Sequence, residues 1–162
     1  MEHTHLLYDG LSLAFPESFR PMTREESAQF AAGGDGEGLC LISQPLHIIV
    51  STGRKPTRGI VGALSRLLSG KDLVKNIETF YKKQMRSFGF STDRYLKRAI
   101  GGATADGLRY TYQAQGIDMT GESFALRRQG AIYYFHVYYR TRLGDESRRV
   151  WDLILDSAKW ND

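Results

Sequence analysis

The sequence is poor in cysteine, lacks long apolar runs and confines its prolines to one end. Cys40 is the only cysteine, which excludes an internal disulfide framework and any zinc or iron–sulfur site built from several cysteines. No apolar run approaches the roughly 18 residues of a membrane-spanning helix, so we expect no membrane span. All four prolines lie between residues 16 and 56, which leaves the later part of the chain free for long regular elements.

The composition is that of one globular domain. Hydrophobic residues make up 41% and charged residues 25% of the 162 positions, which excludes a mostly disordered chain. The sequence has no internal repeat or linker, so we expect a single domain over residues 1–162. The start has neither the basic residues nor the apolar run of a secretory signal. We therefore expect a cytoplasmic protein, unless an export segment has been removed.

The net charge of +4 is distributed unevenly along the chain. Residues 1–53 carry two basic and seven acidic side chains, whereas residues 54–98 carry twelve basic and three acidic ones. This asymmetry predicts either a face for an acidic partner, phosphate or nucleic acid, or a solvated lysine-rich helix. The candidate anion-binding residues are Lys71, Lys75, Lys82, Lys83 and Arg86.

Local signals in the first part of the chain predict short strands and helices. Asp9-Gly10 between apolar runs predicts a hairpin whose second strand ends at Pro16. Thr23 and Glu26 fit a capping box, which predicts a short helix to about residue 31. Apolar patterns further predict two buried strands, at 39–43 and 46–50, and a helix over 58–68.

The rest of the chain predicts one long helix, four strands and a final helix. Gly70 is placed to end the preceding helix, and Asp72 is placed to cap the next one, which Gly89 closes. The final helix begins near Asp145, which is spaced to pair with Arg149. Strands are expected over 95–100, 108–115, 119–128 and 131–140, and the last of these should lie centrally because both its faces are apolar or aromatic.

This order of elements predicts an α+β fold. Hairpin links between consecutive strands give a mainly antiparallel sheet of six or seven strands, with helices on one or both faces. Three stretches, 8–19 (YDGLSLAFPESF), 88–90 (FGF) and 130–160 with its GAIYY start and DSAKW end, resemble the PsbP-like fold group. That group includes the photosystem subunit PsbP, the DcrB lipoproteins and the Ran-binding Mog proteins. The resemblance implies an α/β/α sandwich, and a role in binding other proteins rather than in catalysis.

No familiar catalytic or phosphate-binding motif is present. No serine lies in the Gly-x-Ser-x-Gly setting of an α/β-hydrolase nucleophile. The run that ends Gly70-Lys71-Asp72 lacks the first glycine and the final hydroxyl residue of a Walker loop. Cys40 lies between two leucines, which predicts a buried core residue rather than a nucleophile. We therefore expect no enzyme activity and no cofactor.

The four histidines do not form a recognisable metal-binding pattern. His3 and His5 lie at the terminus. His47 and His136 each lie in a predicted strand, where a histidine is either an ordinary hydrogen-bonded residue of the sheet or, if the strands are neighbours, one of a pair. We expect no bound metal.

The remaining candidate site is a polar and aromatic sheet surface. Alternate residues of the strand 131–140 form one stripe, and the polar residues of 108–115 form another. If both stripes face the same way, they form a floor for a peptide or ligand, because tyrosine and arginine are favoured at binding hot spots. The alternative is that the tyrosines pack beneath a helix. The candidate binding residues are Tyr134, His136, Tyr138, Arg140, Arg109 and Gln113.

From these patterns we predict a non-catalytic protein-binding module of the adaptor or chaperone type, acting as a monomer or homodimer. The first alternative is anion or nucleic-acid binding through the basic 54–98 segment, although no motif for reading bases is present. The second alternative is an enzyme or ligand-binding protein that uses the sheet face around His136.

Overall fold

The computed structural model describes residues 2–8, 10–28, 37–57 and 68–160 of the chain. The helix predicted over 58–68 therefore lies almost wholly outside the described residues. The strands are β1 (Glu2–Tyr8), β2 (Leu11–Pro16), β3 (Arg20–Pro21), β4 (Glu37–Ser43), β5 (Ile48–Pro56), β6 (Ser91–Ile100), β7 (Ala103–Ala114), β8 (Ile117–Arg128), β9 (Ala131–Arg140) and β10 (Lys159–Trp160). The helices are α1 (Arg24–Ala28), α3 (Gly70–Gln84) and α4 (Gly144–Asp156), with 3₁₀ turns at Arg86–Phe88 and Thr141–Leu143.

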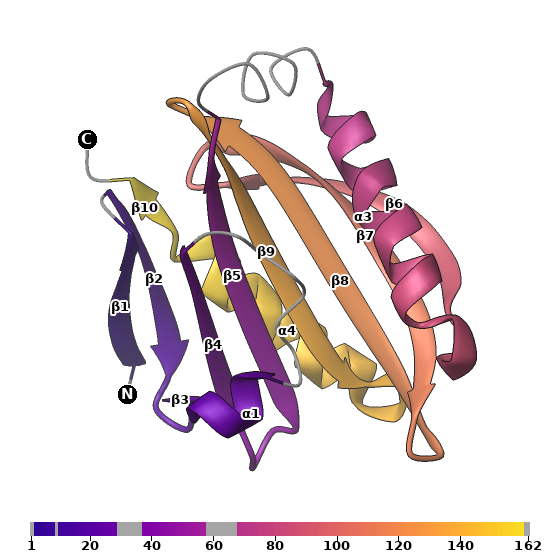
Figure 1. Cartoon of the computed structure of the whole chain (residues 1–162). Coiled ribbons are helices and arrows are strands. Elements are labelled where there is room, and N and C mark those ends of the chain that lie inside the picture. Colours follow the sequence, from indigo (N-terminus) through magenta and orange to yellow (C-terminus); the bar gives the residue numbers. More distant parts are fainter. Residues whose placement is uncertain (1, 9, 29–36, 58–67, 161–162) are drawn as a thin grey trace.

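Seven of the strands form one antiparallel sheet in the order β3-β4-β5-β9-β8-β7-β6 (Figure 1). β9 lies at its centre, as its apolar and aromatic sequence predicts. The predicted α+β class and the antiparallel sheet are thus confirmed. β1, β2 and β10 form a second, three-stranded sheet, which was not expected from the sequence.

Three consecutive tight turns build the meander from β6 to β9. Each turn has two residues with positive φ: Gly101-Gly102 (59° and 82°), Gln115-Gly116 (51° and 78°) and Gln129-Gly130 (47° and 75°). Two consecutive left-handed residues are typical of the type I′ turn, whose twist matches that of the flanking strands. The long strands therefore follow one another directly. The hairpin predicted at Asp9-Gly10 is also confirmed, by the antiparallel pairing of β1 with β2.

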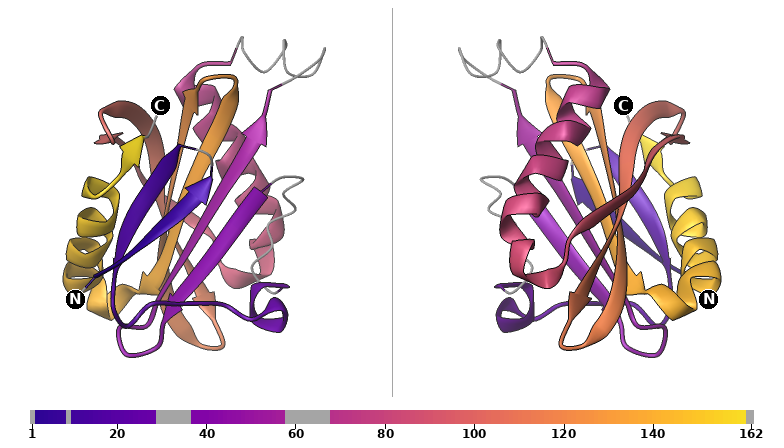
Figure 2. Two further views of the ribbon diagram at one scale, coloured as in Figure 1. Left: turned by 90° about the vertical axis from the view of Figure 1, so that its left-hand side faces the viewer. Right: turned by 90° about the vertical axis from the view of Figure 1, so that its right-hand side faces the viewer.

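Helices lie on both sides of the large sheet (Figure 2). α4 and the small sheet lie on one side, which we call the α4 side, and α3 lies on the other, the α3 side. The two groups of buried side chains stay separate because successive residues of a strand point to opposite faces. The larger core fills the α4 side and includes Leu11, Leu13, Phe15, Phe135, Val137, Trp151 and Ile154.

α3 begins earlier than its sequence signals suggested. Ser69 is the N-cap, because its Oγ accepts from the Asp72 N–H at 3.1 Å while the Asp72 carboxylate accepts from the Ser69 N–H at 2.9 Å. Asp72 therefore completes the capping box from inside the helix and is not the cap itself. Gly70 is the first residue of α3. Its Cα packs against the Asp106 carboxylate, which leaves no room for a Cβ.

Two local expectations near the start of the large sheet have opposite outcomes. The capping box of α1 is confirmed, since the Glu26 N–H donates to Thr23 Oγ1 at 3.1 Å and the Thr23 N–H donates to Glu26 Oε1 at 2.9 Å. The strand expected over 46–50 begins only at Ile48. His47 lies in the exposed turn before it, with a positive φ of 56°, and is not part of a strand.

Candidate functional site: a sheet face with partial helix cover

Among the described elements, α3 covers only one half of its side of the sheet (Figure 1). α3 packs over β7 and β8. Among the described elements, no long helix crosses β9, β5 and β4 on this side. We call the α3 side of these three strands the open face. Its half-buried residues are Cys40, Ile42, Ile49, Ser51, Tyr134 and His136.

Cys40 lies on this open face and not in the core, which corrects the sequence prediction. Its Sγ donates to the Ser51 Oγ of the neighbouring strand at 3.6 Å, and the side chain is half-buried. The adjacent leucines suggested that Cys40 is buried. Leu41 faces the core on the α4 side, and because successive residues of a strand point to opposite faces, Cys40 faces the α3 side.

Three aromatic rings of β9 stack along the border between the covered half and the open face. The rings of Tyr134 and His136 are nearly parallel, with centroids 6.3 Å apart, and those of His136 and Tyr138 are 6.4 Å apart. Tyr81 of α3 meets the His136 ring edge-on at 6.2 Å. Tyr138 is only 4% exposed, whereas Tyr134 is half-buried. Tyr138 is therefore buried on the α3 side, whereas the ring of Tyr134 stays partly accessible.

His136 is held neutral by its surroundings. Its Nδ1 lies 2.6 Å from the Ser123 Oγ, and that hydroxyl lies 3.2 Å from the Tyr110 hydroxyl. Although part of the residue remains exposed, burial of the ring lowers the pKa of His136 to about 4, since the imidazolium form loses its hydration. Ser123 is fully buried and out of reach of a substrate. The contact therefore fixes the imidazole in the sheet face and does not form a nucleophile.

Under α3, the hydroxyls of buried tyrosines lie close to one another. The hydroxyls of Tyr81 and Tyr138 lie 2.6 Å apart, and the rings of Tyr81 and Tyr110 pack with centroids 5.0 Å apart. Burial raises the pKa of all three tyrosines, so they remain neutral hydrogen-bonding groups. The Tyr110 ring packs directly against Gly121, where an added Cβ would overlap the ring.

The two stripes that were expected to form one floor lie on opposite faces. Arg109 pairs across the strands with Glu122 and faces the α4 side, whereas Tyr110 packs with the α3 side cluster. Gln113 also faces the α4 side, where its Nε2 donates to Asp118 Oδ1 at 2.9 Å. Within one strand, alternate side chains point to the same face of the sheet. Whether the polar residues of two strands share a face depends on how the strands are paired.

Arg140 remains on the α3 side with the ring stack. It is half-buried and ends β9, four residues beyond His136. Even-numbered residues of β9 share this face because their side chains alternate with those of the core residues. Four of the six predicted binding residues are therefore together, and the other two are on the far face.

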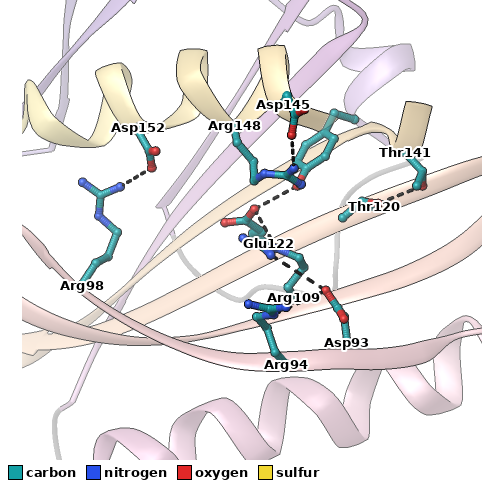
Figure 3. A network of polar contacts seen from close by, with 11 residues as sticks. Asp93, Arg94, Arg98, Arg109, Thr120, Glu122, Thr141, Asp145, Arg148 and Asp152 are labelled. Carbon is teal, nitrogen blue, oxygen red and sulfur yellow. Dashed lines mark hydrogen bonds and ion pairs between the residues drawn. The ribbon is translucent and has the colours of Figure 1, made fainter. Parts of the chain in front are cut away.

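Arg109 belongs to a charged network between the sheet and α4 (Figure 3). Glu122, only 4% exposed, accepts from Arg109 Nε at 3.2 Å and from the Tyr139 hydroxyl at 2.9 Å. Arg148 of α4 donates to the same Tyr139 hydroxyl at 3.5 Å and to Asp145 at 2.7 Å. Because these charges are paired with one another, the network joins α4 to the sheet. Nothing in the sequence marks Glu122 as its centre.

The same network corrects the expected partner of Asp145. Arg149 is spaced four residues from Asp145, but the ion pair is made by Arg148, which also reaches the sheet through Tyr139. An arginine that contacts both the helix start and a buried hydroxyl is held by two partners. The spacing rule alone could not show that second contact.

The basic residues proposed to bind anions are all exposed but do not share one surface. Lys75 and Lys82 lie on either side of Glu78, on the flank of α3 that faces β6, and Lys71 continues that line by one turn. Lys83 lies about 100° around the helix axis from Lys82. Arg86 lies in the 3₁₀ turn beyond the helix.

Glu78 anchors this flank of α3 to β6. It accepts from the Thr92 hydroxyl at 2.5 Å and from the Tyr95 hydroxyl at 2.8 Å, and it is 8% exposed. Burial opposes its ionisation, but the two hydrogen bonds and the charges of Lys82 and Lys75 together lower the pKa of Glu78. The two lysines therefore have a carboxylate nearby, although neither forms a salt bridge with it among the described residues.

The described pocket lies away from the histidine. It has a volume of about 230 Å³ and opens at the start of α3, beside Leu73, Asp106 and Arg127. Within the described ranges, no group of three or more His, Cys, Asp and Glu residues is placed to hold a metal ion. No helix of the described chain is long and apolar enough to span a bilayer.

Comparison with other proteins shows similarity in structure but not in sequence. No protein-family model matches the chain, and no curated protein sequence matches it. The solved structure of the cyanobacterial PsbP protein CyanoP from Synechocystis matches over 99% of this chain and 91% of its own, with a TM-score of 0.71 at 10% identity. The protein has a PsbP-like fold.

Two further solved structures are similar to this PsbP-like chain. The Ran-binding protein Mog1p of Saccharomyces cerevisiae matches with a TM-score of 0.61 at 6% identity, over 100% of this chain and 96% of its own. The immunity protein TplEi of the Pseudomonas aeruginosa T6SS, solved with an "L" peptide, matches with a TM-score of 0.54 at 13% identity, over 76% and 47%. At these identities the likeness confirms the predicted fold group and carries no residue role across.

Proposed function

We propose that this protein is a non-catalytic protein-binding module and that the open face is its docking surface. The observation that carries the proposal is the ring of Tyr134, half-buried beside His136 on strands that no long described helix covers. Contiguous apolar and aromatic surface of this kind marks interaction sites. Tyrosine adds a directed hydrogen bond to a large apolar area, which favours it at binding hot spots.

The chemistry of the open face indicates the kind of protein segment that it accepts. Ile42 and Ile49 provide aliphatic surface next to the rings, and Ser51 provides a hydroxyl. Lys55 and Arg140 lie at opposite ends of the α3 side of β5 and β9. No acidic residue faces this side along the described strands β4, β5 and β9. A partner segment with apolar side chains and acidic ends fits this surface.

The arrangement around His136 favours binding over catalysis. A neutral imidazole that contacts a fully buried hydroxyl has no nucleophile to activate at the surface. The described pocket is lined by other residues and does not include His136. Two proteins of similar fold are also described as binding proteins or peptides, namely the Ran-binding Mog1p and TplEi in its peptide complex.

The test compares one open-face variant with a matched surface variant. Tyr134→Ser removes the accessible ring, and Leu153→Ser removes an apolar side chain that is 62% exposed on α4, on the other side of the molecule. Proteins captured from native lysate by the wild type and by each variant are identified by mass spectrometry. The leading partner is then purified and titrated calorimetrically.

We expect the partner to bind the wild type and Leu153→Ser equally and to bind Tyr134→Ser at least about tenfold more weakly, because truncating a hot-spot ring typically removes more than 1 kcal/mol. Circular dichroism of both variants establishes that each is folded. Equal binding by Tyr134→Ser, or loss of binding by both variants, would contradict the assignment of the open face.

A further inference from the structure

The sheet ends in a long strand whose outer edge faces no other described strand. β6 is ten residues long, and β7 is the strand that it pairs with among the described residues. Figure 2 shows it at the margin of the sheet, beside α3 (right-hand view). A β-bulge between Thr92 and Arg94 disturbs the start of the strand, and the pairing is regular from Arg94 to Ile100. An edge of this length presents backbone groups that pair readily with another strand.

Positive charge accumulates along this edge. Arg94 and Lys97 project from β6, and Lys71, Lys75 and Lys82 line the flank of α3 that faces it. Lys97 is 3.7 Å from Asp106, whereas the described residues provide none of the three α3 lysines with a salt bridge. Arg94 is 3.8 Å from Asp93. Among the described residues, the cations beside this strand edge that form no salt bridge are therefore the three lysines of α3, two of which lie near Glu78.

Tyr95 adds an apolar surface at the same place. It is 57% exposed, and its hydroxyl is held by Glu78 of α3 at 2.8 Å. The ring therefore has a fixed position on the α3 side of β6 while one face stays accessible. A neighbouring strand would lie about 4.8 Å beyond β6, so its side chains on the α3 side would contact this ring and the lysine flank.

We propose that the edge of β6 binds an extended acidic segment of a partner protein by strand addition. Backbone hydrogen bonds to residues 94–99 provide the register, and acidic side chains on the α3 side meet Lys75 and Lys82. A second copy of this chain is a poor occupant, because two β6 edges would bring arginine and lysine against like charges. This surface shares no residue with the open face, so either assignment can fail without the other.

The experiment uses the whole chain and a defined peptide. A fluorescein-labelled peptide of roughly ten residues that alternates glutamate with valine is titrated by fluorescence anisotropy. A second peptide with proline at two central valine positions keeps the charge but cannot form the strand. Lys75→Gln/Lys82→Gln removes two charges from the β6 flank, and Lys83→Gln/Arg86→Gln removes two exposed charges from elsewhere on the same segment.

We expect the proline peptide and the Lys75→Gln/Lys82→Gln variant each to weaken binding at least about tenfold, and the Lys83→Gln/Arg86→Gln variant to change it less than about twofold. Amide hydrogen exchange measured by NMR should slow at residues 94–99 when the alternating peptide is bound. Equal loss in both double variants, equal binding of the proline peptide, unchanged exchange in β6, or no peptide binding would overturn the proposal. Tighter binding of a single-stranded DNA of similar length would overturn it in favour of a nucleic acid.

Discussion

The two sides of the seven-stranded sheet differ in how completely they are covered and in what fills them. On the α4 side, Trp151 and Ile154 of α4 and the strands of the small sheet close over Phe135 and Val137, all at most 1% exposed. On the α3 side, one helix covers β7 and β8, and the aromatic side chains beside it are tyrosines and a histidine, which carry hydrogen-bonding groups. The first arrangement maximises buried apolar area, and the second leaves hydrogen-bonding groups at an accessible border.

Because of this difference, we expect the α4 side to contribute mainly to the stability of the fold and the α3 side to contribute to partner binding. Apolar side chains with complete cover contribute mainly to the free energy of folding, because their surface is removed from water whether or not a partner is present. A half-buried ring such as that of Tyr134 contributes less to folding and retains apolar area for a partner. We therefore expect substitutions on the two sides to have different effects, and the following predictions test that expectation.

The largest expected effect is on the α4 side. Trp151→Ala should lower the free energy of unfolding by about 3–5 kcal/mol, because it leaves a large cavity in a closed core. Tyr134→Ala on the open face should lower it by less than about 1 kcal/mol, since the side chain is only half-buried. Urea unfolding followed by circular dichroism measures both. Comparable losses would show that the two sides contribute equally to stability.

A smaller effect should appear as a pH dependence from the α3 side. The pKa of His136 is lowered to about 4 in the folded protein, against about 6.5 when unfolded. Between these values the unfolded chain binds more protons, so the stability is present above pH 6.5 and is lost as the pH falls towards 4. The loss amounts to about 3 kcal/mol at pH 4.

The control for this pH dependence is His136→Asn, which keeps a polar atom near Ser123 but does not titrate. Unfolding free energies measured from pH 7 to pH 4 should fall less steeply for the variant. Glu26, with its pKa lowered to about 2 by the hydrogen bonds and charge of Arg20 and by Thr23, contributes to the fall in both proteins below about pH 4.5. Parallel curves would show that His136 titrates normally.

The smallest expected effect compares the two sides with one matched change. Gly107→Ala places a methyl group against the Phe124 ring on the α4 side, and Gly121→Ala places one against the Tyr110 ring on the α3 side. Each should lower the free energy of unfolding by about 1–3 kcal/mol, because the ring must leave its position. The Gly121 variant should also lose the Tyr110–Ser123 hydrogen bond, visible as a changed His136 ring signal by NMR. An unchanged His136 signal would show that the ring and the hydroxyl cluster are independent.

Local elements could be predicted from the sequence because their determinants lie within a few residues. The capping box of Thr23 and Glu26 formed as the spacing indicates, and Asp9-Gly10 joins two paired strands. The apolar and aromatic residues on both faces of 131–140 correctly predicted that β9 lies in the centre of the sheet. The Ser69 cap was missed, although its spacing to Asp72 is that of a capping box, because Gly70 was interpreted as a helix end.

The candidate site could be predicted only in part. Tyr134, His136, Tyr138 and Arg140 do share a face, because alternation within one strand is a local property. Arg109 was assigned to the same face, yet it lies across from Glu122 on the other side of the sheet. Whether the polar residues of two strands lie on the same face of the sheet depends on how the strands pair. The alternation of residues within either strand does not show that pairing.

The sequence by itself determined the class of the main helices and strands and the alternation of side chains within each strand, since these follow from backbone preferences and nearest neighbours along the chain. Only the tertiary structure decided which half of the sheet α3 covers, that Arg109 and Tyr139 meet at Glu122, and that β6 is an edge strand among the described residues. These outcomes depend on contacts between residues far apart in sequence, and such contacts form wherever the most apolar surface is buried with its polar groups still paired.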